Sequence, residues 1–118
     1  MDVRSLGAAE PFTTADGSTI RELLNRGVGG AANQSLAEAS LGAGASTQRH
    51  YHRDSEEIYF LLDGDAELEL DGDARHLVPG DAVLIAPGAR HRITAGPGGV
   101  RFLCCCAPPY RHDDTFFD

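Results

Sequence analysis

Short stretches of apolar or alternating residues recur along the whole chain, and turn-forming residues separate them. Residues 67–70 alternate strictly between glutamate and leucine, as in a strand with one wet face. Segments this short and this evenly punctuated predict an antiparallel sandwich or barrel, and no segment predicts a helix. The expected strands span residues 19–24, 35–41, 47–52, 57–62, 67–70, 75–78, 82–86, 91–95 and 100–107.

Side-chain alternation also predicts which residues face the interior. If His50 and Glu57 point inward, the period of two places Gln48, His52, Tyr59 and Leu61 inward with them. Ile58, Phe60 and Leu62 then face outward although they are apolar, so another layer must cover them. We therefore expect a homodimer that packs partly through this outward face.

Length and charge narrow the class of protein. A chain of 118 residues is expected to form one domain that buries roughly two thirds of its unfolded surface. The net charge of −8 argues against nucleic-acid binding, which needs a basic patch. No apolar stretch approaches the roughly 20 residues that cross a bilayer, so no membrane partner is expected. Residues 1–12 lack the apolar core of a signal peptide, which predicts a cytoplasmic protein.

Three adjacent cysteines, Cys104, Cys105 and Cys106, lie inside an apolar run. A structural zinc site would need spaced cysteine pairs, and the sequence has none. We interpret the three as small buried hydrophobes in a reducing cytosol, with a redox role for Cys105 as the lesser alternative.

Three histidines and a glutamate have the spacing of a metal site. His50 and His52 project from the same side of an extended strand, about 7 Å apart. Glu57 adds a carboxylate at the start of the next apolar run, and His91 joins from far along the chain. Imidazole nitrogens with a carboxylate oxygen suit a divalent first-row metal ion.

The segments that contain these residues resemble the paired motifs of the cupin superfamily, small β-barrels of jelly-roll topology. The first is GASTQRHYHRDSEEIYFLLDG at 44–64, and the second is GDAVLIAPGARHRI at 80–93. The chain has Ala86 where the family has proline, and Ala95 where the family often has asparagine; neither position supplies a metal ligand. The resemblance implies an all-β jelly-roll barrel of two antiparallel sheets. It predicts a single cupin domain over 1–118, with an N-terminal strand arm at 1–43 and a short C-terminal tail at 108–118.

The resemblance also implies a site and a class of function. The implied metal ligands are His50, His52, Glu57 and His91, and they would hold one divalent ion of manganese, iron, nickel, copper or zinc. Two open coordination positions would accept a small-molecule substrate. We expect an enzyme that acts on a small oxygenated organic molecule as a dioxygenase, isomerase or decarboxylase. The alternative is a module that binds such a molecule through the metal without transforming it. A storage role, known for some cupins, has no need of four ligands.

The remaining polar residues have simpler interpretations. Glu56 competes with Glu57 for the carboxylate role, but alternation admits only one of them inside, and the distance to Gly64 favours Glu57. Tyr59 and Gln48 are candidate pocket residues. His76 and His112 are expected at the surface. Residues 110–114 would form a lid or an intersubunit strap, although a frayed terminus is commoner.

Overall fold

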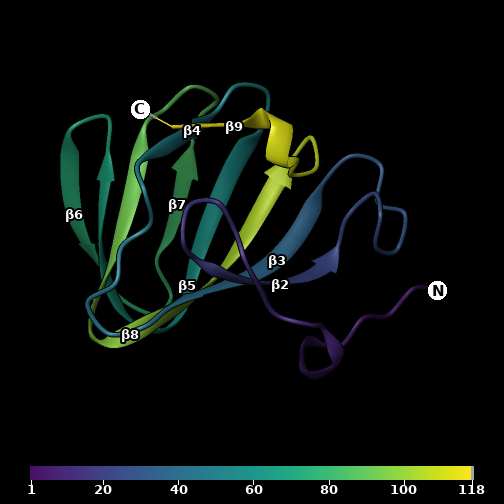
Figure 1. Cartoon of the computed structure of the whole chain (residues 1–118), viewed down its shortest axis with the longest axis horizontal. Coiled ribbons are helices and arrows are strands. Elements are labelled where there is room, and N and C mark those ends of the chain that lie inside the picture. The colour runs from purple at the N-terminus through teal and green to yellow at the C-terminus, as the bar shows by residue number, and fades with distance from the viewer. Residues whose placement is uncertain (118) are drawn as a thin grey trace.

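Strands make up most of the chain in the computed structural model, which describes residues 1–117 (Figure 1). The strands are β1 (Phe12–Thr13), β2 (Thr19–Leu24), β3 (Ser35–Leu41), β4 (His50–His52), β5 (Glu56–Leu70), β6 (Asp73–Leu77), β7 (Ala82–Ile85), β8 (His91–Ala107) and β9 (Thr115–Phe117). Two single-turn 3-10 helices, η1 (Leu6–Ala8) and η2 (His112–Asp114), complete the list. The all-β prediction is confirmed. Among residues 1–117, no helix has the length and apolar character that a membrane span requires.

Two long strands, β5 and β8, pair antiparallel along almost their whole length and belong to both walls of the barrel. In the first wall, the late part of β8 lies between β3 and the early part of β5, and β5 also pairs with β7. In the second wall, the late part of β5 pairs with β6 and with the early part of β8, whose first residue pairs with β4. The walls are therefore the two halves of one continuous, strongly bent sheet.

The bend lies where separate strands were expected. Residues 57–62 and 67–70 form the single strand β5, and residues 91–95 and 100–107 form the single strand β8. Asp63-Gly64 is thus not a turn: the register shifts between Leu61 and Asp63 and again between Gly64 and Ala66, while the pairing continues. Such bulges bend a strand without ending it, so the same dipeptide serves as a corner.

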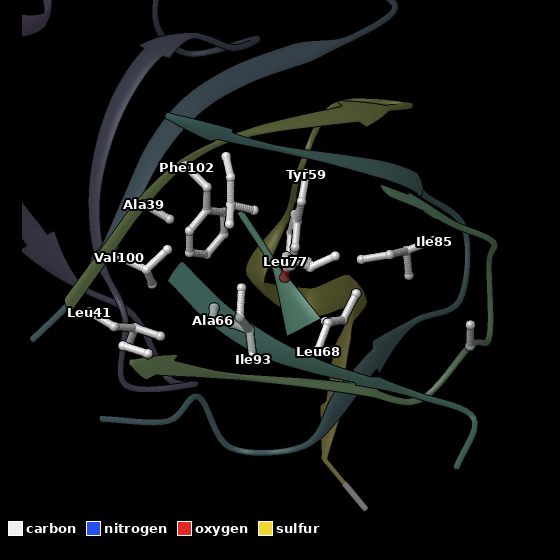
Figure 2. Packing of buried hydrophobic residues seen from close by; sticks show 13 residues of the cluster. Ala39, Leu41, Tyr59, Ala66, Leu68, Leu77, Ile85, Ile93, Val100 and Phe102 are labelled. Atoms are coloured by element: carbon white, nitrogen blue, oxygen red, sulfur yellow. The ribbon is translucent and has the colours of Figure 1, made fainter. Parts of the chain in front are cut away.

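The core fills the space between the walls (Figure 2). Tyr59 and Phe102 from the first wall face Leu68 and Ile93 from the second. Leu61 and Ile93 are fully buried, and the same alternation leaves Ile58 and Phe60 on the outer face, 40% and 38% exposed. The predicted inward and outward sides of this part of β5 are correct, except that Leu62 is partly buried.

Both terminal segments add strands to the sheet. Within the 1–43 arm, β1 and β2 extend the first wall beside β3, and residues 1–5 run away from the barrel (Figure 1). At the other end, β9 pairs with β4, with His50 opposite Phe117 and His52 opposite Thr115. The tail therefore ends in a paired strand, Thr115–Phe117, rather than in a frayed end; Asp118 lies outside the described residues.

We expect Gly64→Ala to destabilise the protein far more than Gly72→Ala. Both glycines have positive φ angles, +76° and +85°. A Cβ at Gly64 would overlap the Gly99 carbonyl of the paired strand, whereas a Cβ at Gly72 meets nothing within 4 Å. The strain at Gly72 should cost about 1 kcal/mol, and the added backbone clash at Gly64 should raise the loss to about 3 kcal/mol or more. Urea unfolding of both variants measures the difference, and equal losses would contradict the corner assigned to Gly64.

Candidate metal centre

Strand pairing places the three predicted histidines at one spot. His50 on β4 lies directly opposite His91, the first residue of β8, and the two rings are 4.2 Å apart between centroids. His52 lies two residues further along the same face of β4. One ring nitrogen from each histidine lies within 4.8 Å of the others, and all three side chains are buried.

Glu57 approaches this cluster from the opposite wall, near the start of β5. Its Oε1 lies 3.4 Å from Nε2 of His52 and 3.4 Å from Nε2 of His91, and the residue is 4% exposed. The structure therefore brings all four predicted residues together, with the carboxylate in direct contact with two of the three histidines. Its neighbour Glu56 is exposed, as predicted.

Backbone carbonyls determine which nitrogen of each ring faces the cluster. Nδ1 of His50 lies 2.8 Å from the Gln48 carbonyl, Nδ1 of His91 lies 2.9 Å from the Ala89 carbonyl, and Nδ1 of His52 lies 3.2 Å from the Asp114 carbonyl. A carbonyl oxygen can only accept, so each Nδ1 carries the proton and donates. In the neutral ring, Nε2 then presents its lone pair to the centre.

The centre is consequently a buried cluster of acceptors. Within residues 1–117, Glu57 Oε1 and His91 Nε2 are buried without any hydrogen-bond partner. Burying unpaired acceptors side by side is unfavourable unless a cation lies between them. Three imidazole nitrogens and a carboxylate oxygen are the donor set that divalent first-row metals prefer, so these residues fit a metal ion.

The local electrostatics favour the protonation states that a metal needs at His50 and Glu57, but not at His52. Burial lowers the pKa of His50, and the neighbouring His91 lowers it further. Burial opposes ionisation of Glu57 and protonation of His52, but their mutual contact outweighs it, because the pKa of Glu57 falls well below its usual range and that of His52 rises. An ionised carboxylate and a neutral His50 are both ready to ligate, and a metal ion would displace the proton that His52 shares with Glu57.

A cavity opens from the cluster toward β2 and β3. Its empty volume of about 510 Å³ includes open solvent at its mouth. The wall residues are mixed in character: Thr14, Asp16, Ser18, Ile20, Glu22, Ser35, Ala37, Ala39, Thr47, His50, Glu57, Tyr59, Phe102, Cys104, Cys106 and Tyr110. Tyr59 lies on the cavity wall, as predicted. Burial and the charge of Glu57 raise its pKa well above the usual value, so the phenol stays protonated.

The prediction that Gln48 points inward is wrong. Its side chain is exposed, and the neighbouring Thr47 is buried instead. Strand β4 begins only at His50, so the period of two does not extend back to Gln48. The backbone of Gln48 contributes in place of its side chain, because its carbonyl orients the His50 ring.

Comparison with known proteins agrees with this geometry. The family model described as "Cupin domain" matches residues 37–106, which include all four clustered residues. The chain belongs to the cupin family.

Several proteins resemble this cupin over most of its length. An uncharacterized protein of Methanocaldococcus jannaschii, MJ1618, is 42% identical over 107 residues, covering 90% of this chain and 86% of its own. The crystal structure of a protein from Planctomyces limnophilus is 27% identical, with a TM-score of 0.84 and coverage of 99% and 96% of the two chains. The polyketide cyclase RemF from Streptomyces resistomycificus is 26% identical, with a TM-score of 0.80 and coverage of 91% and 79%.

The cysteines of this cupin differ from one another. Cys106 is buried, and its Sγ donates to Glu57 Oε2 at 3.3 Å, so it contacts the oxygen of Glu57 that faces away from the histidines. Burial and the charge of Glu57 raise the pKa of Cys106, which therefore remains a thiol. Cys104 lines the cavity, and Cys105 pairs with Ile58 on the outer face. All three are free cysteines and only Cys106 is fully buried, so the predicted burial is correct for one of the three.

Sequence reasoning missed two aspartates beside the site, Asp16 and Asp114. Asp16 lies in a polar segment before the first expected strand, and Asp114 belongs to the segment 110–114 that was expected to form a lid, a strap or a frayed end. The side chain of Asp114, which is 3% exposed, accepts hydrogen bonds from the backbone N–H groups of Arg53, Asp54 and Ser55. Its carbonyl also faces His52 Nδ1. Asp114 therefore ties the tail to the loop between β4 and β5 and orients one histidine.

Asp114→Ala should destabilise the protein by about 3 kcal/mol, because three backbone N–H groups, one of them in the buried residue Ser55, lose a charged acceptor that is itself buried. The adjacent Asp113 is exposed, and within residues 1–117 its one ion pair is with Arg111, so Asp113→Ala should change the free energy of unfolding by less than about 0.5 kcal/mol. Urea denaturation of the two variants gives the comparison. A loss at Asp114 no larger than at Asp113 would show that the tail does not support the site.

Proposed function

We propose that this cupin is a metal-dependent enzyme that acts on a small oxygenated organic molecule, with chemistry of the dioxygenase, isomerase or decarboxylase type. The observation that carries the proposal is the buried cluster of acceptor atoms beside a cavity whose wall includes His50 and Glu57. A purely structural barrel would have no reason to retain unpaired polar atoms there, because apolar residues would be more stable.

His50, His52, His91 and Glu57 would hold one divalent ion of manganese, iron, nickel, copper or zinc. Such an ion supplies either Lewis acidity toward a substrate oxygen or a path for electron transfer. The backbone carbonyls of Gln48, Ala89 and Asp114 hold the rings in place for this role. In metal sites generally, hydrogen bonds to the ring nitrogen that does not bind the metal fix the orientation of the histidine ring.

Other side chains of the cavity suit an oxygenated substrate. The phenol of Tyr59 stays protonated and lies 6.0 Å from His91 between ring centroids, close enough to donate to a substrate oxygen beside the metal. Ile20, Ala39 and Phe102 offer apolar contacts to a carbon skeleton. The similarity to RemF, a polyketide cyclase, supports an enzyme of this architecture.

We further propose that the protein acts as a cytoplasmic homodimer. Ile58, Phe60 and Leu84 are exposed on the outer face of β5 and β7, and Ile58 pairs directly with Leu84. An uncharged apolar face is complementary to the same face of a second copy, as a two-fold interface requires. Because the net charge of the chain is −8, two copies that met through their charged surfaces would repel each other. Three free cysteines support a reducing compartment.

Protein purified without a histidine tag and reconstituted with each metal in turn should hold about one equivalent of a divalent transition metal. His52→Ala and His91→Ala should lose most of this metal, since each removes a buried ligand. His76→Ala is the matched control, because His76 is 62% exposed and pairs with Asp65 away from the cluster. Elemental analysis gives the stoichiometry, and circular dichroism checks that the variants fold.

Metal retained at one equivalent by both ligand variants would contradict the proposed centre. The loaded protein should convert at least one member of a panel of diols, hydroxyketones and diketones, with and without dioxygen, and mass spectrometry detects the product. Tight binding by calorimetry with the ligand recovered unchanged would instead identify the alternative, a metal-anchored binding module.

Light scattering at micromolar concentration should give twice the chain mass of 12.5 kDa. Leu84→Arg should shift the protein toward a monomer, because it places a charge in the proposed interface. Val3→Arg introduces the same charge at an exposed apolar residue outside this face and should leave the dimer intact. A stable wild-type monomer would remove the homodimer from the proposal.

A further inference from the structure

Several hydrogen bonds from neighbouring residues hold the side chain of Asp16 beside the histidine cluster. Its Oδ1 accepts from Thr14 Oγ1 at 2.6 Å, from the Ser18 amide at 2.9 Å and from Ser18 Oγ at 2.7 Å. Its Oδ2 is directed toward Nε2 of His50, 3.6 Å away. The side chain is 16% exposed and lies on the cavity wall, so one carboxylate oxygen is anchored and the other faces the centre.

The backbone also links Asp16 to the histidines. The Gln48 amide donates to the Asp16 carbonyl at 2.7 Å, and the Gln48 carbonyl accepts from His50 Nδ1. One residue therefore positions both the carboxylate and the ring that it faces. Gly17, at a φ of +97°, allows the tight turn that presents Asp16.

His50 and Asp16 repeat the relation between Glu57 and the other two histidines. His50 donates through Nδ1, so its Nε2 lone pair faces the Asp16 carboxylate as one acceptor faces another. The arrangement is favourable when positive charge lies nearby. The cluster thus has carboxylates on two sides, Glu57 from β5 and Asp16 from the turn between β1 and β2.

We propose that Asp16 is a second functional carboxylate of the metal centre and that it makes the cavity select uncharged or cationic chelating molecules over anionic ones. This inference rests on the proposed metal-dependent function and narrows its substrate class. Two carboxylates neutralise a divalent ion, whereas Glu57 alone would leave one positive charge to attract an anion.

The rest of the cavity has the same electrostatic character. Glu22 on β2 also lines it, and its Oε1 accepts from Asn25. Among the lining residues within 1–117, none is an arginine, and the whole chain contains no lysine. A carboxylate or phosphate ligand would therefore enter beside three acidic side chains with no arginine or lysine to pair with, which like-charge repulsion opposes. A hydroxyketone, a diol or an amine-bearing chelator meets no such barrier.

Two measurements with Co²⁺ as the metal test the role of Asp16. The first is the affinity for Co²⁺ itself, which should fall about tenfold in Asp16→Asn, because a negative charge beside the ion is lost. The second compares glycolate with glycolamide, two chelators of nearly the same shape that differ in charge, through changes in the visible spectrum. Asp16→Asn should raise the affinity for glycolate relative to glycolamide about tenfold.

Asp73→Asn is the matched control, because this exposed carboxylate lies on β6 and does not line the cavity. It should leave both the Co²⁺ affinity and the chelator ratio within twofold of the wild type. Asp16→Ser provides a second uncharged variant if Asp16→Asn does not fold, and circular dichroism decides which is used.

The outcomes separate the two proposals. If the wild-type protein takes up Co²⁺ and the Asp16 variants show the same metal affinity and chelator ratio, the role proposed for Asp16 is wrong. The proposed metal centre is then unaffected. Wild-type protein that takes up no metal overturns the proposed function and this inference with it. A shift equally large in Asp73→Asn would trace the effect to net charge and also overturn the inference.

Discussion

The pairing of β5 with β8, and its bend at Gly64, is the constraint on which the rest of the molecule depends. At one end of this ribbon Glu57 pairs with Cys106, and at the other end Leu70 pairs with His91. In a straight ribbon, the 13 residue-to-residue steps from Glu57 to Leu70 would separate those ends by roughly 40 Å. In the folded protein, Glu57 Oε1 lies 3.4 Å from His91 Nε2. The bend therefore both encloses the core and assembles the cluster.

The cluster imposes a cost that the surrounding backbone reduces but does not remove. Three carbonyls satisfy the outer nitrogen of each histidine, and Asp114 satisfies three amides of the loop that leads into β5. These hydrogen bonds fix the rings, yet they leave the inner lone pairs facing one another and Glu57. Buried polar networks that are incompletely satisfied are unfavourable in a small core. A bound cation would complete the network, and this is the physical basis of the proposed function.

Charge then distinguishes this cavity from a general metal pocket. Asp16 and Glu57 approach the histidines from different elements, the turn between β1 and β2 and the start of β5, and Glu22 adds further negative charge on the cavity wall. In a low-dielectric cavity, fixed charges of one sign act strongly on an entering ligand. The same fold with a basic residue at one of these positions would favour acids. The chemistry that a cupin performs is thus set by a few side chains on a common scaffold.

Local information was sufficient for the strand-rich class, the sides of β5 and the four clustered residues. Period-two alternation and short-range spacing are properties of the extended chain itself, so His50, His52 and Glu57 could be recognised before folding. The fusion of 57–62 with 67–70 could not, because Asp63-Gly64 suits a turn or a bulge equally well and only the partner strand decides. Gln48 was misplaced because β4 starts at His50, three residues after the start of the expected strand 47–52. Asp16 and Asp114 act through hydrogen bonds to residues roughly 30 to 60 positions away, and such contacts exist only once the sheet has bent and the tail has paired with β4. The sequence by itself thus determined which side chains could bind a metal, and the tertiary structure alone decided which acceptors surround them and what charge an entering ligand meets.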